Sequence, residues 1–176
     1  ISIIVAQTNG VVSQWFPARD KAGDTYLAHV RDFNPPGDAK LTALGVEQRR
    51  RGFAVGDETG RVSLFYATSQ RLLHTEQAFK KPVSRIAFNP RAQTLLAESS
   101  EGKVHAYHVH NEHPEVSLAA LWGKVWYESY DEARWLWQSS SASSDFEPKF
   151  SLTPLAFGTL KGAFYAMIFA IPLAIM

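Results

Sequence analysis

Four histidines lie close together in the sequence and form a group of side chains whose type suits metal binding. They are His105, His108, His110 and His113. His108 and His110 are two positions apart, so on a β-strand their side chains would share a face, as paired metal ligands must. The chain has no cysteine, and no carboxylate is positioned with the histidines except Glu112 and Glu115. We therefore interpret the histidines as exposed residues at strand ends and predict no metal or other cofactor site.

A run of three arginines is a second group that could do chemistry, since guanidinium groups bind anions such as phosphate. The run consists of Arg49, Arg50 and Arg51. An internal repeat, described below, aligns it with the turn at residues 91–93. A solvated hairpin tip is therefore the better interpretation.

A third group is acidic and has one arginine beside it. It consists of Glu128, Asp131, Glu132 and Arg134. On a helix Glu128 and Glu132 would be one turn apart, a spacing that general acid–base catalysis can use. No nucleophile or histidine accompanies them, and the sequence has no phosphate-binding glycine-rich loop, His-Glu-x-x-His or Gly-x-Ser-x-Gly motif. We predict a solvated acidic face and a chain that is not an enzyme.

The arginines and two of the four histidines, His105 and His108, belong to a repeat, which indicates the elements that position them. Residues 41–66 align with residues 83–108 at an offset of 42 without a gap. The aligned pairs include Leu44 with Ile86, Phe53 with Leu95, Gly60 with Gly102 and Phe65 with Tyr107. A partial third copy lies upstream at an offset of 50, where Gly10 aligns with Gly60 and Trp15 aligns with Phe65. The Asn-Pro-Pro-Gly sequence at 34–37 indicates an inserted loop that accounts for the longer offset.

Each copy has the local chemistry of β-structure. Residues 83–88, 94–97 and 103–107 are predicted strands, separated by turns at 89–92 and 99–102. Gly10, Gly60 and Gly102 supply the positive φ that a tight hairpin needs. Short strands at hairpin spacing, in a repeat of roughly 40–45 residues, are typical of β-propeller blades.

Residues 83–107 resemble a WD40-type blade. The aspartate that this family has before the glycine is Glu101 here, and its tryptophan position holds Tyr107. The resemblance implies an all-β region, a fragment of a WD40-like β-propeller, over residues 1–113. A closed ring needs at least four blades, so we expect further blades upstream of Ile1. An antiparallel sheet or sandwich with accidental self-similarity is the alternative.

Residues 114–150 are predicted to link the blades to the end of the chain. Trp122, Trp126 and Tyr130 recur every four residues, which would place them on one face of a helix. Such a stripe is usually core packing, although tryptophan and tyrosine also favour the membrane interface. The serine-rich residues 138–144 are interpreted as a flexible linker.

The last segment, residues 151–176, is predicted to be an α-helical membrane-type segment. Residues 163–176 contain no charge, although this run is shorter than the roughly 20 residues that span a bilayer. Pro172 disfavours the interior of a soluble helix more than that of a membrane helix. A buried helix of a soluble protein is the alternative.

Residues 146–174 resemble the opening of a binding-protein-dependent ABC permease domain. The matching features are Gly-Thr-Leu at 158–160 and Ala-Ile-Pro at 170–172. Together with the aromatic residues 126–138 and the serine linker, they make residues 121–176 similar to the long-form phosphate transport permease family, PstC. This resemblance implies a permease subunit that imports inorganic phosphate across the bacterial inner membrane, with the β region as a docking domain on the periplasmic side. The implied partners are a second permease subunit, an ATP-binding subunit and a periplasmic phosphate-binding protein.

Two other interpretations remain open at this point. A non-catalytic β-propeller scaffold for protein–protein interaction would also fit the repeats, and a propeller enzyme that uses the histidines is a weaker alternative. The net charge of +1 gives no electrostatic reason to expect a nucleic-acid partner.

Overall fold

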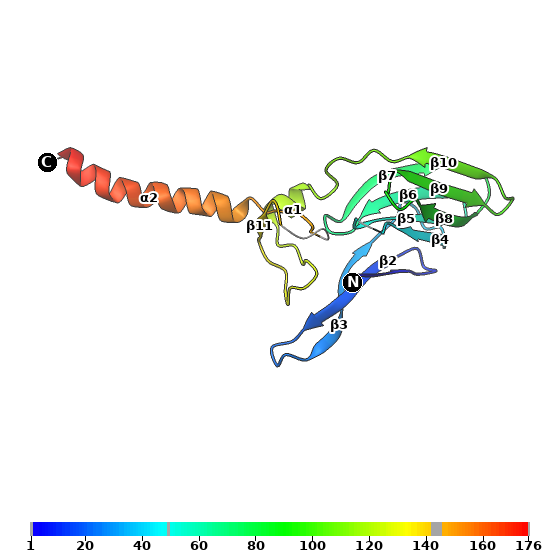
Figure 1. The fold of residues 1–176 in the computed structure, drawn as a ribbon, viewed down its shortest axis with the longest axis horizontal. Helices are drawn as coiled ribbons and strands as arrows, with labels where there is room; N and C mark the ends of the chain where they lie inside the picture. The colour runs from blue at the N-terminus through cyan, green and yellow to red at the C-terminus, as the bar shows by residue number, and fades with distance from the viewer. Residues whose placement is uncertain (1, 49, 142–145, 176) are drawn as a thin grey trace.

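The computed structural model describes residues 2–48, 50–141 and 146–175. Three antiparallel sheets come first, an irregular segment follows, and a long helix projects away from the sheets (Figure 1). The predicted all-β region followed by an α-helical segment is thus confirmed.

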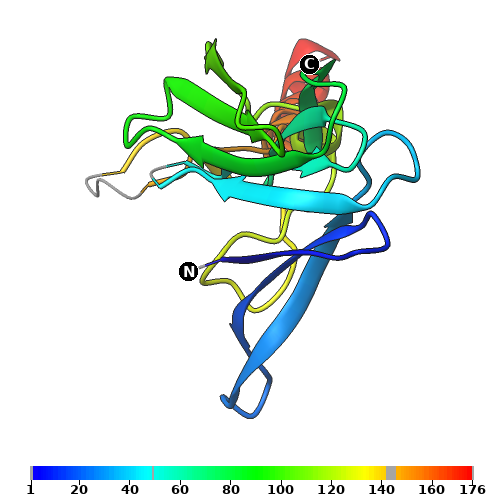
Figure 2. The ribbon, with the colours of Figure 1, turned by 90° about the vertical axis from the view of Figure 1, so that its right-hand side faces the viewer.

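The three sheets have the strand order of consecutive propeller blades, and we call them blades 1, 2 and 3. Blade 1 contains β1 (Ile3–Ala6), β2 (Val12–Arg19) and β3 (Thr25–Phe33). Blade 2 contains β4 (Leu41–Val46), β5 (Gly52–Asp57), β6 (Arg61–Tyr66) and β7 (Arg71–Gln77). Blade 3 contains β8 (Val83–Phe88), β9 (Thr94–Ser99) and β10 (Val104–His108). Figure 2 shows blade 1 diverging from the other two.

The repeat in the sequence is a repeat of strands. At the offset of 42, β4 falls on β8 and β5 falls on β9 residue for residue, and β6 overlaps β10. The same hairpin turn occurs in each blade, with a φ of 90° at Gly10, 90° at Gly60 and 77° at Gly102. Gly60 is also fixed by space, since a Cβ there would lie 2.3 Å from the carbonyl oxygen of Phe79.

Apolar side chains pack the blades against one another. Between blades 2 and 3 the buried residues are Ala54, Val62, Ala78, Phe79, Val83, Ile86, Leu95 and Ala97. Gly56 lets β8 approach closely, because a Cβ at this position would lie 2.5 Å from the Cβ of Val83. Between blades 1 and 2 the ring of Phe53 stacks on that of Phe65, with 5.3 Å between centroids, and meets the ring of Phe33 edge-on.

Residues 111–152, which we call the connector, run from blade 3 back across blades 1 and 2. The connector contains α1 (Leu118–Trp122), β11 (Trp137–Gln138) and β12 (Lys149–Phe150). The predicted linker at 138–144 falls partly outside the described residues, and Gln138 belongs to β11.

The predicted helical stripe of Trp122, Trp126 and Tyr130 is wrong. Helix α1 ends at Trp122, where Gly123 turns into extended backbone. The chain then forms a bridge between Val125 and Arg134. In a helix the carbonyl of Trp126 would accept from the backbone N–H of Tyr130, whereas here it accepts from a guanidinium of blade 1. A tertiary contact therefore overrides the local spacing.

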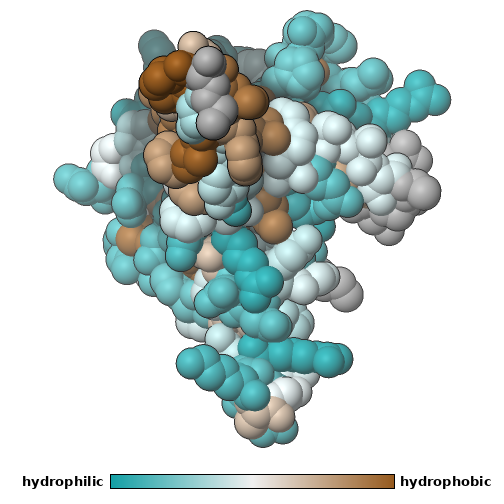
Figure 3. Space-filling view, turned by 90° about the vertical axis from the view of Figure 1, so that its left-hand side faces the viewer, coloured by the Kyte–Doolittle hydropathy of each residue, from teal (hydrophilic) through white to brown (hydrophobic). Residues whose placement is uncertain are grey.

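Helix α2 (Thr153–Ile175) is 23 residues long, and none of its residues is buried. It is long and apolar enough to cross a membrane, judged by length and composition alone. Figure 3, which looks along the helix from its free end, shows apolar side chains gathered on α2 in front of largely hydrophilic blades.

Candidate functional site

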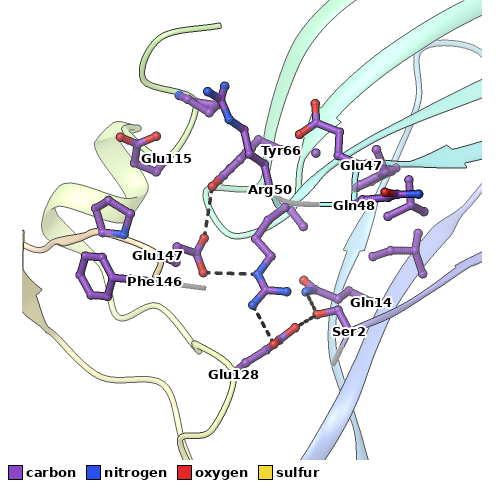
Figure 4. A pocket seen from close by; sticks show the side chains of 18 of the residues that line it. Ser2, Gln14, Glu47, Gln48, Arg50, Tyr66, Glu115, Glu128, Phe146 and Glu147 are labelled. Atoms are coloured by element: carbon purple, nitrogen blue, oxygen red, sulfur yellow. Dashed lines mark hydrogen bonds and ion pairs between the residues drawn. The ribbon is translucent and has the colours of Figure 1, made fainter. Parts of the chain in front are cut away.

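A pocket of about 600 Å³ lies where the connector meets blades 1 and 2. Its walls are the β4–β5 turn, the ends of β1 and β2, and connector residues near 112–115, 128 and 146–148. Figure 4 shows that two carboxylates of the connector, Glu128 and Glu147, both contact one arginine. We call the contact formed by Arg31, Arg51, Tyr66, Glu128 and Glu147 the junction.

Arg51 joins blade 2 to the connector at two points. Its Nη2 lies 2.8 Å from Oε2 of Glu128, and its Nε lies 3.8 Å from Oε2 of Glu147. The hydroxyl of Tyr66, at the end of β6, donates to the other oxygen of Glu147 over 3.4 Å. Ser2 donates to the second oxygen of Glu128. Both connector carboxylates are thus held by blade residues.

Arg31 joins blade 1 to the connector from a buried position on β3. Its guanidinium donates to the backbone carbonyls of Ala67 and Thr68 in blade 2 and of Trp126 in the connector. Burial lowers the pKa of Arg31 to about 10, although the charge of Glu147 acts in the opposite direction. The group remains charged at neutral pH, and one side chain connects three parts of the chain.

The carboxyl groups at the junction are partly desolvated. Burial raises the pKa of Glu147 above its ordinary value, even though the hydrogen bond from Thr68 and the charges of Arg51 and Arg31 act to lower it. Burial also raises the pKa of Glu47, on the opposite wall, although Arg50 lies close to it. Burial, together with the charge of Glu147, raises the pKa of Tyr127 to about 12.

Further hydrogen bonds fix the connector beside the junction. The hydroxyl of Ser69 donates to the carbonyl of Pro114 over 2.7 Å, and that of Ser117 donates back to the carbonyl of Ser69 over 3.2 Å. Ser117 also caps α1 by accepting from the N–H of Ala120. The ring of Trp126 meets that of Phe16 edge-on at 5.7 Å. The arrangement is suited to holding two segments together, and its charged side chains are engaged with one another.

The predicted arginine and acidic groups meet in space, which the sequence interpretation did not anticipate. The prediction of a solvated hairpin tip is wrong for Arg51, because its side chain is half-buried against Glu128 and Glu147. Arg50 donates to the carbonyl of Asn111, while Arg49 lies outside the described residues.

The prediction of a solvated acidic face is correct for only part of the acidic group. It is wrong for Glu128, whose side chain is 16% exposed and faces Arg51. Asp131 and Glu132 are exposed, and Glu132 pairs with Arg134 at 3.4 Å.

The four histidines are spread along β10 and the start of the connector. His105 packs against the ring of Phe79 with 4.5 Å between centroids, and His113 pairs with Glu115. His108 and His110 border a second pocket of about 420 Å³ between blades 2 and 3. Within the described ranges, no three histidine or carboxylate side chains lie together as metal ligands would.

Arg31, Tyr66 and Glu147 are the functional residues that sequence reasoning missed. One signal was present for Arg31, since it shares a strand face with Phe33, two residues further on, which is buried. An arginine at an inward-facing strand position indicates a buried polar partner. Nothing in the sequence pairs Tyr66 with Glu147, because they are 81 positions apart.

No family model matches the sequence, and no curated protein matches it. The fold is similar to solved β-propellers. The C-terminal WD40 domain of Sif2 has a TM-score of 0.52 and 14% identity, over 61% of this chain and 30% of that chain. The β-propeller domain of Cps50 (Swd1) from Myceliophteria thermophila has a TM-score of 0.54 and 12% identity, over 62% of this chain and 35% of that chain.

The likeness identifies the fold of the β region. The chain spans about a third of the length of these two propellers, and its three sheets follow one another as blades do. The β region is a fragment of a WD40-like β-propeller, as predicted, and the alternative of an accidental antiparallel sandwich is wrong. The similarity of residues 121–176 to phosphate permeases stays a prediction.

Proposed function

We propose that this chain is a non-catalytic, membrane-tethered β-propeller module that presents a protein-docking surface at a fixed position beside a membrane. The observation that carries the proposal is the set of polar contacts that attaches the blades to the connector and the connector to Thr153, the first residue of α2. A domain joined to its membrane helix in this way has a defined orientation, which a flexible linker would not provide.

Three hydrogen bonds attach the last two residues of the connector and the first residue of α2 to the connector segment 121–137. The N–H of Leu152 donates to the carbonyl of Leu121 over 2.7 Å, and the N–H of Ser151 donates to that of Leu136 over 2.9 Å. The hydroxyl of Thr153 donates to the carbonyl of Trp122 over 3.1 Å. The start of α2 is therefore attached to both ends of the segment that carries the connector's tryptophans.

The surface of α2 supports a bilayer as its surroundings. At about 1.5 Å per residue its 23 residues extend about 34 Å, close to the thickness of the hydrocarbon core. Large apolar side chains are exposed along the whole length, among them Phe157 at 69% and Phe169 at 71%. A continuous apolar surface of this size needs a partner, and lipid is one that matches a helix apolar on all sides.

The blades support a docking role. Their hairpin turns are loops on a scaffold of packed strands, the usual place for recognition surfaces. The charged side chains of the junction pair with one another, as expected for a structural contact, so we look for the docking surface on the hairpin turns.

Alkaline extraction tests the tether. We expect the 176-residue chain, produced in bacterial cells, to stay in the membrane fraction at high pH, because α2 would be inserted. The matched control ends at Leu152 and should be released, with the far-ultraviolet circular dichroism of β-structure retained. Release of the longer chain would contradict the proposal.

A finer proposal follows from the resemblance noted in the sequence. Gly158-Thr159-Leu160 and Ala170-Ile171-Pro172 both lie within α2, so the features similar to a phosphate permease are on the tether itself. We propose that α2 opens the membrane domain of a phosphate-importing ABC permease in a bacterial inner membrane, with the blades on the periplasmic side. Its partners would be a second permease subunit, a separate ATP-hydrolysing subunit and a periplasmic phosphate-binding protein.

The finer proposal is tested with purified phosphate-binding protein and this chain in lipid nanodiscs. We expect association that changes with phosphate, because such a binding protein presents different surfaces with and without its ligand. Nanodiscs that carry only the segment after Glu147 are the control for non-specific binding. Absence of association both with and without phosphate would contradict the docking role of the blades in phosphate import.

A further inference from the structure

Three exposed tryptophans gather where α2 leaves the connector. Trp122 is 55% exposed, and Trp135 and Trp137 are each 44% exposed. Leu118, on α1, is 79% exposed. We call these four residues the tryptophan patch. Large aromatic side chains rarely remain this open in a group without a partner surface.

Contacts place the patch at the first turn of α2. The indole N–H of Trp135 donates to the carbonyl of Trp122 over 3.0 Å, and the same carbonyl accepts from the hydroxyl of Thr153, the first residue of α2. The ring of Trp137 lies 5.6 Å from that of Phe150, three residues before the helix. The patch is thus fixed to the point where the chain would enter a bilayer.

The local sequence does not by itself force the connector's tryptophan side chains to be exposed, as its fourth tryptophan, Trp126, shows. Trp126 packs its ring on Phe16 of blade 1 and donates its indole N–H to the carbonyl of Tyr130. Trp122 and Trp135, four and nine residues away on either side, are instead exposed. The connector therefore has one aromatic side that meets the blades and another that is open beside α2.

Charge beside the patch favours a surface that carries phosphate groups. The ammonium of Lys124 lies 4.6 Å from the ring centroid of Trp135, so a cation sits on the patch itself. Tryptophan concentrates at the headgroup level of bilayers, where the ring contacts glycerol and upper acyl carbons and the N–H meets polar groups. Lysine beside it adds attraction to anionic lipid.

We propose that the tryptophan patch binds the headgroup region of the lipid bilayer next to the entry point of α2, and so fixes the depth and orientation of the connector. This inference rests on the proposed function, because it takes α2 to be the membrane span. Lys161 is the one charged residue of α2 and lies about 12 Å along the helix from Thr153. Its ammonium lies 5.7 Å from the ring centroid of Tyr165, four residues further along the helix.

Fluorescence quenching by brominated lipids tests the patch directly. The 176-residue chain is reconstituted into phosphatidylcholine–phosphatidylglycerol vesicles whose acyl chains carry bromine either near the glycerol or near the bilayer centre. We expect shallow bromine to quench the tryptophan emission more than deep bromine does. Trp122→Phe, Trp135→Phe and Trp137→Phe should each lower the quenched part of the emission.

Trp15→Phe is the matched control, because Trp15 lies on β2 against His29 and away from α2. Its removal should leave the quenched part unchanged. Circular dichroism of each variant checks that the β-structure is retained. Patch variants that lose no quenched emission, while Trp15→Phe does lose it, would overturn the inference.

Alkaline extraction of the same vesicles separates the two proposals. If the chain resists extraction but shallow bromine does not quench the patch, the headgroup contact is wrong and the tether stands. If the chain is extracted, the tether is wrong and the inference falls with it. Extraction-resistant chain with selective shallow quenching of the patch supports both.

Discussion

The blades meet one another and the connector through two chemically different contacts. Blade 2 packs on blade 3 through uncharged side chains such as Val62, Val83 and Ile86. Blade 2 meets the connector through Arg51 and Glu147, and Arg31 of blade 1 adds its hydrogen bonds to the same joint. Apolar packing responds weakly to salt and pH, whereas charged contacts respond to both. Changes in salt and pH should therefore have little effect on the packing between blades 2 and 3 and a larger effect on the contact between the blades and the connector.

The largest effect should come from opening the apolar contact between blades. Phe53 is fully buried, and its ring contacts Phe33 and Phe65. We expect Phe53→Ala to lower the free energy of unfolding by about 3–5 kcal/mol, because it leaves a cavity among packed rings. Thermal unfolding of the chain in detergent, followed by β-sheet circular dichroism, measures the effect.

Leu27→Ala on β3 is the control for Phe53→Ala, since Leu27 is 53% exposed and should change stability by less than about 0.5 kcal/mol. Equal effects of the two substitutions would mean that the blades do not depend on this packing.

The second effect is at the buried side of the junction. We expect Arg31→Met to cost about 2–4 kcal/mol, because it removes the guanidinium donor from three backbone carbonyls and leaves Glu147 without one of its cations. Hydrogen exchange should show faster exchange at residues 125–137 than in β8 and β9. Arg19→Met, at an exposed strand end, is the control and should leave both regions unchanged. If hydrogen exchange became faster by the same factor in blade 3 and in the connector, the contact between the blades and the connector would not be independent of the packing between the blades.

A smaller effect is expected at the half-buried side of the junction. Arg51→Ala should cost about 1 kcal/mol, since the ion pair with Glu128 is partly open to water. Raising the salt concentration should speed exchange in the connector of the unmodified chain and have little effect in the Arg51→Ala variant. A salt response of the same size in both chains would exclude Arg51 as its source.

The smallest effect is a dependence on pH. Because burial raises the pKa of Glu147, the folded chain holds this proton more tightly than the unfolded chain does. The cost of burying the charge is therefore present at neutral pH and is removed as the pH falls through the raised pKa. We expect Glu147→Gln to reduce the gain in thermal stability between pH 7 and about pH 5, the range just above the ordinary carboxyl pKa.

Glu47 contributes to the same slope with the same sign, so Glu147→Gln should reduce the slope without abolishing it. Glu132→Gln, at an exposed position, is the control and should leave the slope as it is. An unaltered slope in Glu147→Gln would show that this carboxyl is not the group that titrates.

The sequence predicted the fold well where structure is local and repeated. The offset of 42 placed β8 and β9 correctly, because hairpin strands and their glycine turns depend on neighbouring residues. The connector was harder. The spacing of Trp122, Trp126 and Tyr130 indicated a helix, but the carbonyl of Trp126 is taken by Arg31, 95 positions away. The junction was missed for the same reason, since Arg51 and Glu128 are 77 positions apart and nothing in either local pattern points to the other.

The hydrogen bonds that attach Ser151 and Leu152 to the rest of the connector have a mechanical consequence. When a flexible linker joins a membrane helix to its domain, the helix can tilt to match the thickness of the bilayer without moving the domain. The residues just before α2 lack that freedom, because the backbone N–H groups of Ser151 and Leu152 donate to the carbonyls of Leu136 and Leu121. In the membrane-tethered chain that we propose, a change in bilayer thickness that tilts α2 would therefore turn the blades with it.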